Sequence, residues 1–170
     1  MTDNSREQPT RTGSFRAAVR AGANLTEYTR AGAGRPVLLL LQRDGQDTAY
    51  PADILTAISS QFRVIAPERI PNGTEFGQWL STFLDGLGLD AISIVTEDEF
   101  GVPVFGFALL EPARVRRVVV LSKTSPETEA AGAAVANPGV PEGSHPFLII
   151  RYGGPVDETV HRVVQFLATP

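Results

Sequence analysis

One stretch of the chain, residues 92–112, constrains the fold more than any other part of the sequence. It reads ISIVTEDEFGVPVFGFALLEP, in which residues 92–95 have the length and apolarity of a buried strand and residues 102–110 those of a helix. The polar residues 96–100 between them predict a sharp turn. When such a turn follows the carboxyl end of a central strand in an open α/β sheet, its side chains point into the crevice that binds ligands. The sequence therefore predicts a functional site at three consecutive acids, Glu97, Asp98 and Glu99.

Apolar segments of strand length alternate with amphipathic helices along most of the chain. Strands are predicted at residues 37–41, 62–66, 92–95, 115–121 and 147–150, and helices at residues 51–60, 74–87, 102–110 and 156–167. Two earlier segments, residues 15–20 and 25–30, predict an antiparallel hairpin. Strands that alternate with helices form a parallel sheet with right-handed crossovers. We therefore predict a three-layer α/β fold, in which helices cover both faces of a mostly parallel twisted sheet of about seven strands that begins with the hairpin.

The composition limits the class of protein and its partners. The 170 residues fit one domain, predicted over residues 14–170, and the polar residues 1–13 predict a flexible tail. A net charge of −4 without a basic patch argues against a nucleic-acid partner. No apolar run is long enough to span a membrane, and residues 1–13 lack the apolar segment of a secretion signal. Because the chain also contains no cysteine, we expect a cytoplasmic protein without disulfides.

Taken together, the segments from Phe15 to Leu167 resemble the α/β-hydrolase superfamily. LTEYTRAGAGRPVLLLL is similar to that family's second strand, turn and third strand, and FRVIAPERIPNG to its fourth strand and the following loop. FGQWLSTFLDGLGLDAISIV and FALLEPARVRRVVVLS are similar to its helix, central strand, nucleophile helix and sixth strand, and HPFLII to its seventh strand. The resemblance implies a truncated, lidless member. A loop at residues 122–144 stands where the family inserts its lid, and the last strand with the catalytic histidine has no counterpart after Gly154.

The family's catalytic motifs are altered in this sequence. In the motif Gly-x-Ser-x-Gly, the nucleophile lies on a strained turn between strand and helix, and the turn needs small neighbours. The corresponding residues here are 96–100, so both glycines are replaced and Asp98 occupies the nucleophile position, as in the haloalkane dehalogenase and epoxide hydrolase branches. The resemblance also implies positions for four further residues: Gln42 and Arg43 where the family builds its oxyanion hole, Phe100 beside the ligand, and Asp157 near the triad acid.

The two histidines do not restore a catalytic triad. His145 is predicted at the amino end of the last strand, which is the wrong end for the crevice, and His161 lies within the closing helix. Without a histidine to activate water, an ester formed on Asp98 would not turn over well. The sequence therefore disfavours ordinary hydrolase chemistry.

Two functions of different classes remain open. Neighbouring carboxylates repel, and burial favours the protonated form, so Glu97, Asp98 and Glu99 could serve as acid and base on a small apolar molecule. Such an unconventional enzyme would catalyse a cyclisation, elimination, isomerisation or ring opening. Alternatively, the chain is a catalytically inactive relative that binds a small ligand or a protein partner. Neither function requires a metal or a cofactor, and we expect a homodimer formed through the truncated side.

Overall fold

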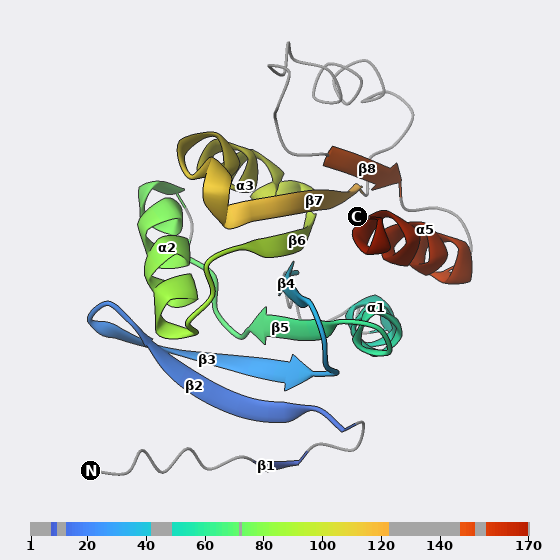
Figure 1. Cartoon of the computed structure of the whole chain (residues 1–170), viewed down its shortest axis with the longest axis horizontal. Helices are drawn as coiled ribbons and strands as arrows, with labels where there is room; N and C mark the ends of the chain where they lie inside the picture. The colour runs from blue at the N-terminus through green and yellow to red at the C-terminus, as the bar shows by residue number, and fades with distance from the viewer. Residues whose placement is uncertain are drawn as a thin grey trace.

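A twisted sheet runs through the molecule, and its strands lie in the spatial order β1-β2-β3-β5-β4-β6-β7-β8 (Figure 1). The computed structural model describes residues 8–9, 13–41, 49–71, 73–122, 147–151 and 156–169. The strands in these ranges are β1 (Gln8–Pro9), β2 (Phe15–Ala21), β3 (Asn24–Ala31), β4 (Pro36–Leu40), β5 (Arg63–Pro67), β6 (Ile92–Glu97), β7 (Val115–Ser122) and β8 (Phe147–Arg151). All pairs among β5, β4, β6, β7 and β8 are parallel. The predicted mostly parallel α/β sheet is confirmed.

The amino-terminal strands β1, β2 and β3 are antiparallel, and β3 also runs antiparallel to β5. The predicted hairpin is confirmed, with Gly22 and Ala23 as the two residues that connect β2 to β3. Gly22 has a φ of 63°, which a side chain would disfavour and which two-residue hairpin turns often require at their first position. The short strand β1 lies within residues 1–13, which the sequence predicts as a flexible tail, and the sequence analysis did not predict a strand there.

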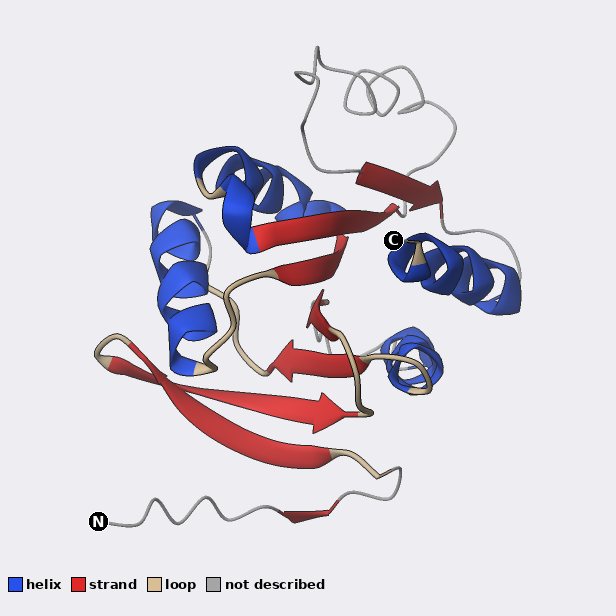
Figure 2. Cartoon of the chain, in the orientation of Figure 1, coloured by secondary structure: helices blue, strands red, loops and turns tan. Residues whose placement is uncertain are grey.

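Helices cover both faces of the sheet (Figure 2). On one face lie α2 (Phe76–Gly86) and α3 (Asp98–Leu110), and on the other lie α1 (Ala49–Ser59) and α5 (Val156–Ala168). The short 3-10 helices η1 (Gly73–Glu75) and η2 (Pro112–Arg114) precede α2 and β7. Because the central strands lie between two helical layers, β6 is buried along its whole length. None of the described helices is long and apolar enough to cross a membrane.

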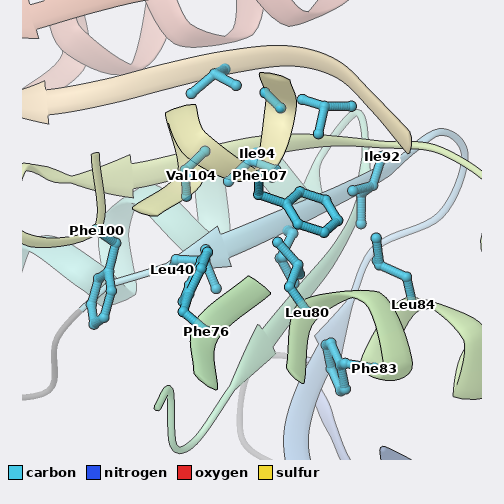
Figure 3. Packing of buried hydrophobic residues seen from close by; sticks show 14 of the residues in the cluster. Leu40, Phe76, Leu80, Phe83, Leu84, Ile92, Ile94, Phe100, Val104 and Phe107 are labelled. Atoms are coloured by element: carbon cyan, nitrogen blue, oxygen red, sulfur yellow. The ribbon is translucent and has the colours of Figure 1, made fainter. Parts of the chain in front are cut away.

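The apolar stripe of α2 forms the centre of one core layer (Figure 3). Its members are almost fully buried: Phe76, Leu80, Phe83 and Leu84. Their spacing in the sequence predicts this face of the helix, and the prediction is confirmed. Trp79 on the same helix stacks on Phe83 with ring centroids 5.3 Å apart, and its indole N–H donates to the Thr26 hydroxyl at 3.3 Å. The helix therefore joins the parallel part of the sheet to the hairpin.

Gly86 and Arg114 fix the carboxyl end of α2. A Cβ atom on Gly86 would overlap a backbone carbonyl oxygen of β2, so this position requires glycine. The Arg114 guanidinium donates to the Leu89 carbonyl at 2.9 Å and to the Ser81 hydroxyl at 3.1 Å. It also forms an ion pair with Asp85 at 2.7 Å. These contacts hold the segment that enters β6, and β6 is the strand that leads to the predicted site.

Candidate functional site

The junction between β6 and α3 lies at the carboxyl edge of the sheet. The turn predicted at residues 96–100 is wrong, because β6 continues through Glu97 and α3 begins at Asp98 without an intervening loop. Thr96 and Glu97 belong to the strand because they pair with Val120 and Leu121 of the parallel neighbour β7. The strand therefore leads directly into the helix.

The backbone at this junction has none of the strain of a nucleophile elbow. Glu97 has φ −91° and ψ 169°, which is extended backbone, and Asp98 is already helical. Among the residues that the structure describes, every residue with a positive φ is a glycine. Thr96 and Phe100 stand at the two positions where the family motif has glycines. The sequence therefore lacks the small residues that let the backbones of strand and helix approach closely. Asp98 is not presented in the way a strained turn presents a nucleophile.

The three consecutive acids lie in different surroundings. Glu97 is buried, with 8% of its surface exposed, whereas Asp98 and Glu99 are exposed. Asp98 and Glu99 occupy the first turn of α3, where a negative charge interacts favourably with the helix dipole. The structure therefore places one carboxylate at the edge of the interior and two at the surface, where they also stabilise the start of the helix.

Asp98 is held by a serine from the neighbouring strand. Ser122 is the last residue of β7 and is 6% exposed, and its hydroxyl donates a hydrogen bond to Asp98 Oδ2 at 3.0 Å. The sequence reasoning missed this pair, because the pairing depends on the register of two strands that are far apart in the sequence. Because Glu97 pairs with Leu121 in parallel register, the next residue of each chain segment, Asp98 and Ser122, falls at the same place on the carboxyl edge.

Thr96 links the carboxyl ends of β4 and β6. It is fully buried, and its hydroxyl donates to the Leu40 carbonyl at 3.2 Å. Leu40 ends β4 shortly before Gln42 and Arg43, the two residues predicted to contact a ligand opposite Asp98. Gln42 and Arg43 lie outside the described residues. Thr96 is therefore a structural residue beneath the site, and the role of the other two stays a prediction.

Phe100 belongs to the core layer that also contains the apolar stripe of α2, which we call the core layer beneath α2. It is 4% exposed, and its ring stacks on Phe76 with centroids 6.3 Å apart and planes 20° apart. Figure 3 shows it beside Phe76 and Leu40, among the apolar side chains of this layer. The structure gives Phe100 a packing role, and its predicted contact with a ligand stays a prediction.

Two further candidate residues that the structure describes belong to α5, on the opposite face of the sheet from α3. Asp157 and His161 are both exposed, and Asp157 lies in the first turn, where an acid stabilises the helix. His145, Gly154 and residues 123–144 of the loop predicted in place of a lid lie outside the described residues. Within the described ranges, no group of three His, Cys, Asp or Glu side chains could hold a metal ion.

Known proteins share the fold and part of the sequence of this chain. A 2-hydroxy-6-oxo-2,4-heptadienoate hydrolase from Pseudomonas putida is 32% identical over 117 residues, which cover 61% of this chain and 42% of that protein. A meta-cleavage product hydrolase from Pseudomonas fluorescens superposes with a TM-score of 0.54 at 25% identity, over 62% of this chain and 44% of the other. The chain belongs to the α/β-hydrolase superfamily.

The carboxylesterase CesB from Bacillus subtilis shares the fold with a TM-score of 0.55 at 23% identity, over 72% of this chain and 50% of the other. No family model matches the sequence. The chain spans 42% of the curated relative it matches and half or less of these two structures. In α/β-hydrolases the nucleophile follows the central strand, and here that position holds the helical residue Asp98. The role of Asp98 at this position stays a prediction.

Proposed function

We propose that this α/β-hydrolase binds a small, largely apolar molecule at the carboxyl edge of its sheet and transfers a proton on it through Asp98. The observation that carries the proposal is the hydrogen bond from the buried Ser122 to the Asp98 carboxylate. A carboxylate held by a neighbouring strand has a defined direction, and general acid–base catalysis depends on such positioning. Glu97 and Glu99 are the adjacent carboxylates and the candidates for a second proton-transferring group.

The position of Asp98 suits a general base. It follows the carboxyl end of a central strand, where ligands of open α/β sheets bind. Its side chain is exposed, so a small molecule can reach it. A hydrogen bond to one oxygen of a carboxylate orients the group, and the group can still accept a proton. Asp98 can therefore be oriented by Ser122 and accept a proton from a ligand at the same time.

Proton transfer fits this junction better than nucleophilic attack. A covalent ester on Asp98 would need a second base to activate the water that hydrolyses it. His161, the histidine within the described ranges, is exposed on α5, across the sheet from α3. The start of α3 also lacks the strained geometry that presents a nucleophile. An isomerisation by proton transfer requires neither of these features.

The Pseudomonas putida relative suggests a probe for this activity. Its name gives 2-hydroxy-6-oxo-2,4-heptadienoate as the substrate, and this molecule is a conjugated enol. Conversion of an enol to a ketone moves one proton from oxygen to carbon. Asp98 would accept the hydroxyl proton as the C–O bond becomes C=O, and the same carboxyl group would return a proton to a carbon of the diene. No co-reactant enters or leaves, so the step balances.

The test measures how fast the absorbance of this conjugated enol disappears, with the products separated by chromatography. We expect the wild-type protein to accelerate ketonisation, and Asp98→Asn, which keeps an oxygen for Ser122, to lower that rate by about 10²-fold or more. Glu111→Gln, which removes an exposed carboxylate from the other end of α3, is the matched control and should retain the activity. Equal rates for the wild type and Asp98→Asn would overturn the proposal.

A catalytically inactive ligand-binding protein is the second candidate, and the unstrained junction favours it. In that case the same probe would bind saturably without conversion, and Asp98→Asn would bind it with unchanged affinity. The homodimer expected from the sequence stays a prediction, and sedimentation equilibrium would measure it.

A further inference from the structure

A cavity of about 330 Å³ lies at the amino edge of the sheet, at the opposite end of β6 from Asp98. It opens between the first residues of β4, β6 and β7 and the end of α5. Sites for small ligands have volumes of roughly 300–1,000 Å³, so the cavity suits a small molecule. The crevice that α/β-hydrolases use lies at the other edge, so this is a separate site.

Three arginines border the cavity, and its described lining contains no acidic residue. Arg35 directly precedes β4, and Arg116 and Arg117 lie near the start of β7. Arg63 begins β5, and its backbone N–H donates to the Arg35 carbonyl at 3.0 Å, which brings a fourth arginine to the same edge. In a chain with a net charge of −4, this local concentration of positive charge attracts anions.

These arginines differ in the contacts they already make. Arg117 donates to the Phe166 carbonyl in α5 at 3.2 Å, and its guanidinium lies 5.2 Å from the centroid of the Phe166 ring. Arg117 therefore stabilises the end of the helix. Arg35 and Arg116 are exposed, and the ion pairs within the described ranges involve other arginines. Both remain available for an anion in the cavity.

The rest of the lining determines which kind of anion fits. Phe62 and Leu167 supply an apolar wall, and Ser93, which is 8% exposed, supplies a hydroxyl at the start of β6. An inorganic ion would leave the apolar wall uncovered, whereas an apolar molecule would leave Arg35 and Arg116 without a partner. We propose that this cavity binds a small organic anion, in which a phosphate or carboxylate group is attached to an apolar group.

Phenyl phosphate and benzoate are suitable probes, and phenol and inorganic phosphate present the two halves of the ligand separately. Binding would be followed by amide chemical shifts in NMR spectra of the whole chain. We expect saturable shifts centred on Ser93, Arg116 and Thr169 with phenyl phosphate or benzoate, and weaker binding of phenol and inorganic phosphate. The tighter of the two probes would identify the anionic group.

Variants of the cavity test the proposal directly. Arg35→Gln and Arg116→Gln should each weaken binding about tenfold or more, because each removes a charged hydrogen-bond donor. Arg20→Gln and Arg30→Gln remove exposed charges from the hairpin and should change the affinity by less than about twofold. Asp98→Asn should also leave the affinity of the cavity unchanged. This test is therefore independent of the activity proposed for Asp98. No saturable shift up to about 10 mM, equal binding of phenol, or equal losses in the hairpin variants would overturn the proposal.

Discussion

The core layer beneath α2 and the junction between β6 and α3 contact each other, yet they are subject to different constraints. In the core layer, Phe76, Leu80 and Phe83 are at most 1% exposed. At the junction, Asp98 and Glu99 are exposed and the backbone carries no positive φ. A hydrolase needs strain at this junction to present its nucleophile. The difference shows that the packing which determines a fold can persist where the geometry of the family's chemistry is absent.

Phe100 belongs to both regions. Its position corresponds to the second glycine of the family motif, and its ring packs in the core layer against Phe76. The residue that changes the motif most therefore also contributes to the core. If Phe100 contributes strongly to stability, packing stands in this molecule where the family has a strained turn. Variants at this position measure how much that packing contributes to the free energy of unfolding.

The largest effect is expected for Phe100→Gly, which restores the glycine of the family motif. We expect the free energy of unfolding to fall by about 4–6 kcal/mol, since a buried Phe→Ala change costs about 3–5 kcal/mol and glycine in a helix costs about 1 kcal/mol more. Urea denaturation followed by circular dichroism would give the value. Val102→Gly, at a residue of the same helix that is 76% exposed, is the matched control and should cost about 1 kcal/mol or less. Similar losses at both positions would show that Phe100 lies outside the core.

A smaller effect is expected for Arg114→Met, which acts on the segment that enters β6. The variant leaves the Leu89 carbonyl and the Ser81 hydroxyl without this donor, so we expect a loss of about 2–3 kcal/mol in urea denaturation. Asp85→Asn removes the ion pair and keeps the other contacts. Because Asp85 is 64% exposed, this control should cost less than about 1 kcal/mol. Equal losses for the two variants would mean that the ion pair, and not the hydrogen bonds, holds the segment.

The core layer and the elements that form it could be predicted from the sequence, because the pattern of apolar residues that identifies each element is local. The spacing of apolar residues in α2 identifies its buried face, and the alternation of strands and helices identifies the parallel sheet. The hairpin follows from two short strand segments around Gly22. In each case the residues that determine the element lie within it.

The junction could be predicted only in part, because its structure depends on residues far apart in the sequence. Thr96 and Glu97 are polar and suggest a turn, yet the Leu40 carbonyl and the pairing with β7 keep them in the strand. The bond between Asp98 and Ser122 depends on the register of two parallel strands, which no single segment encodes. Long-range hydrogen bonds therefore determine both the end of β6, which the sequence-based prediction placed too early, and the pairing of Asp98 with Ser122, which it missed.

The bond between Ser122 and Asp98 gives the next prediction, which concerns the junction alone. Ser122→Ala should lower the free energy of unfolding by about 1 kcal/mol, because it removes one hydrogen bond to a charged acceptor that is exposed. Combined with Asp98→Ala in a double-mutant cycle, the two changes should show a coupling energy of about 0.5–1 kcal/mol. Fully additive losses would show that the two side chains act independently in solution, and would remove the main support for a positioned carboxylate.

The smallest effect is expected for Gly101→Ala, and it tests the junction most sharply. In a strained elbow, glycines are needed because strand and helix backbones approach closely. Here a Cβ atom on Gly101 would lie 3.6 Å from Val120 Cγ1, which is an ordinary contact, and the position is helical. Alanine should therefore stabilise the protein by about 0.5–1 kcal/mol through its higher helix propensity, as measured by urea denaturation. A loss of stability would instead show that β7 and α3 approach as closely as the strand and helix of a nucleophile elbow do, which would reduce the contrast between core and junction.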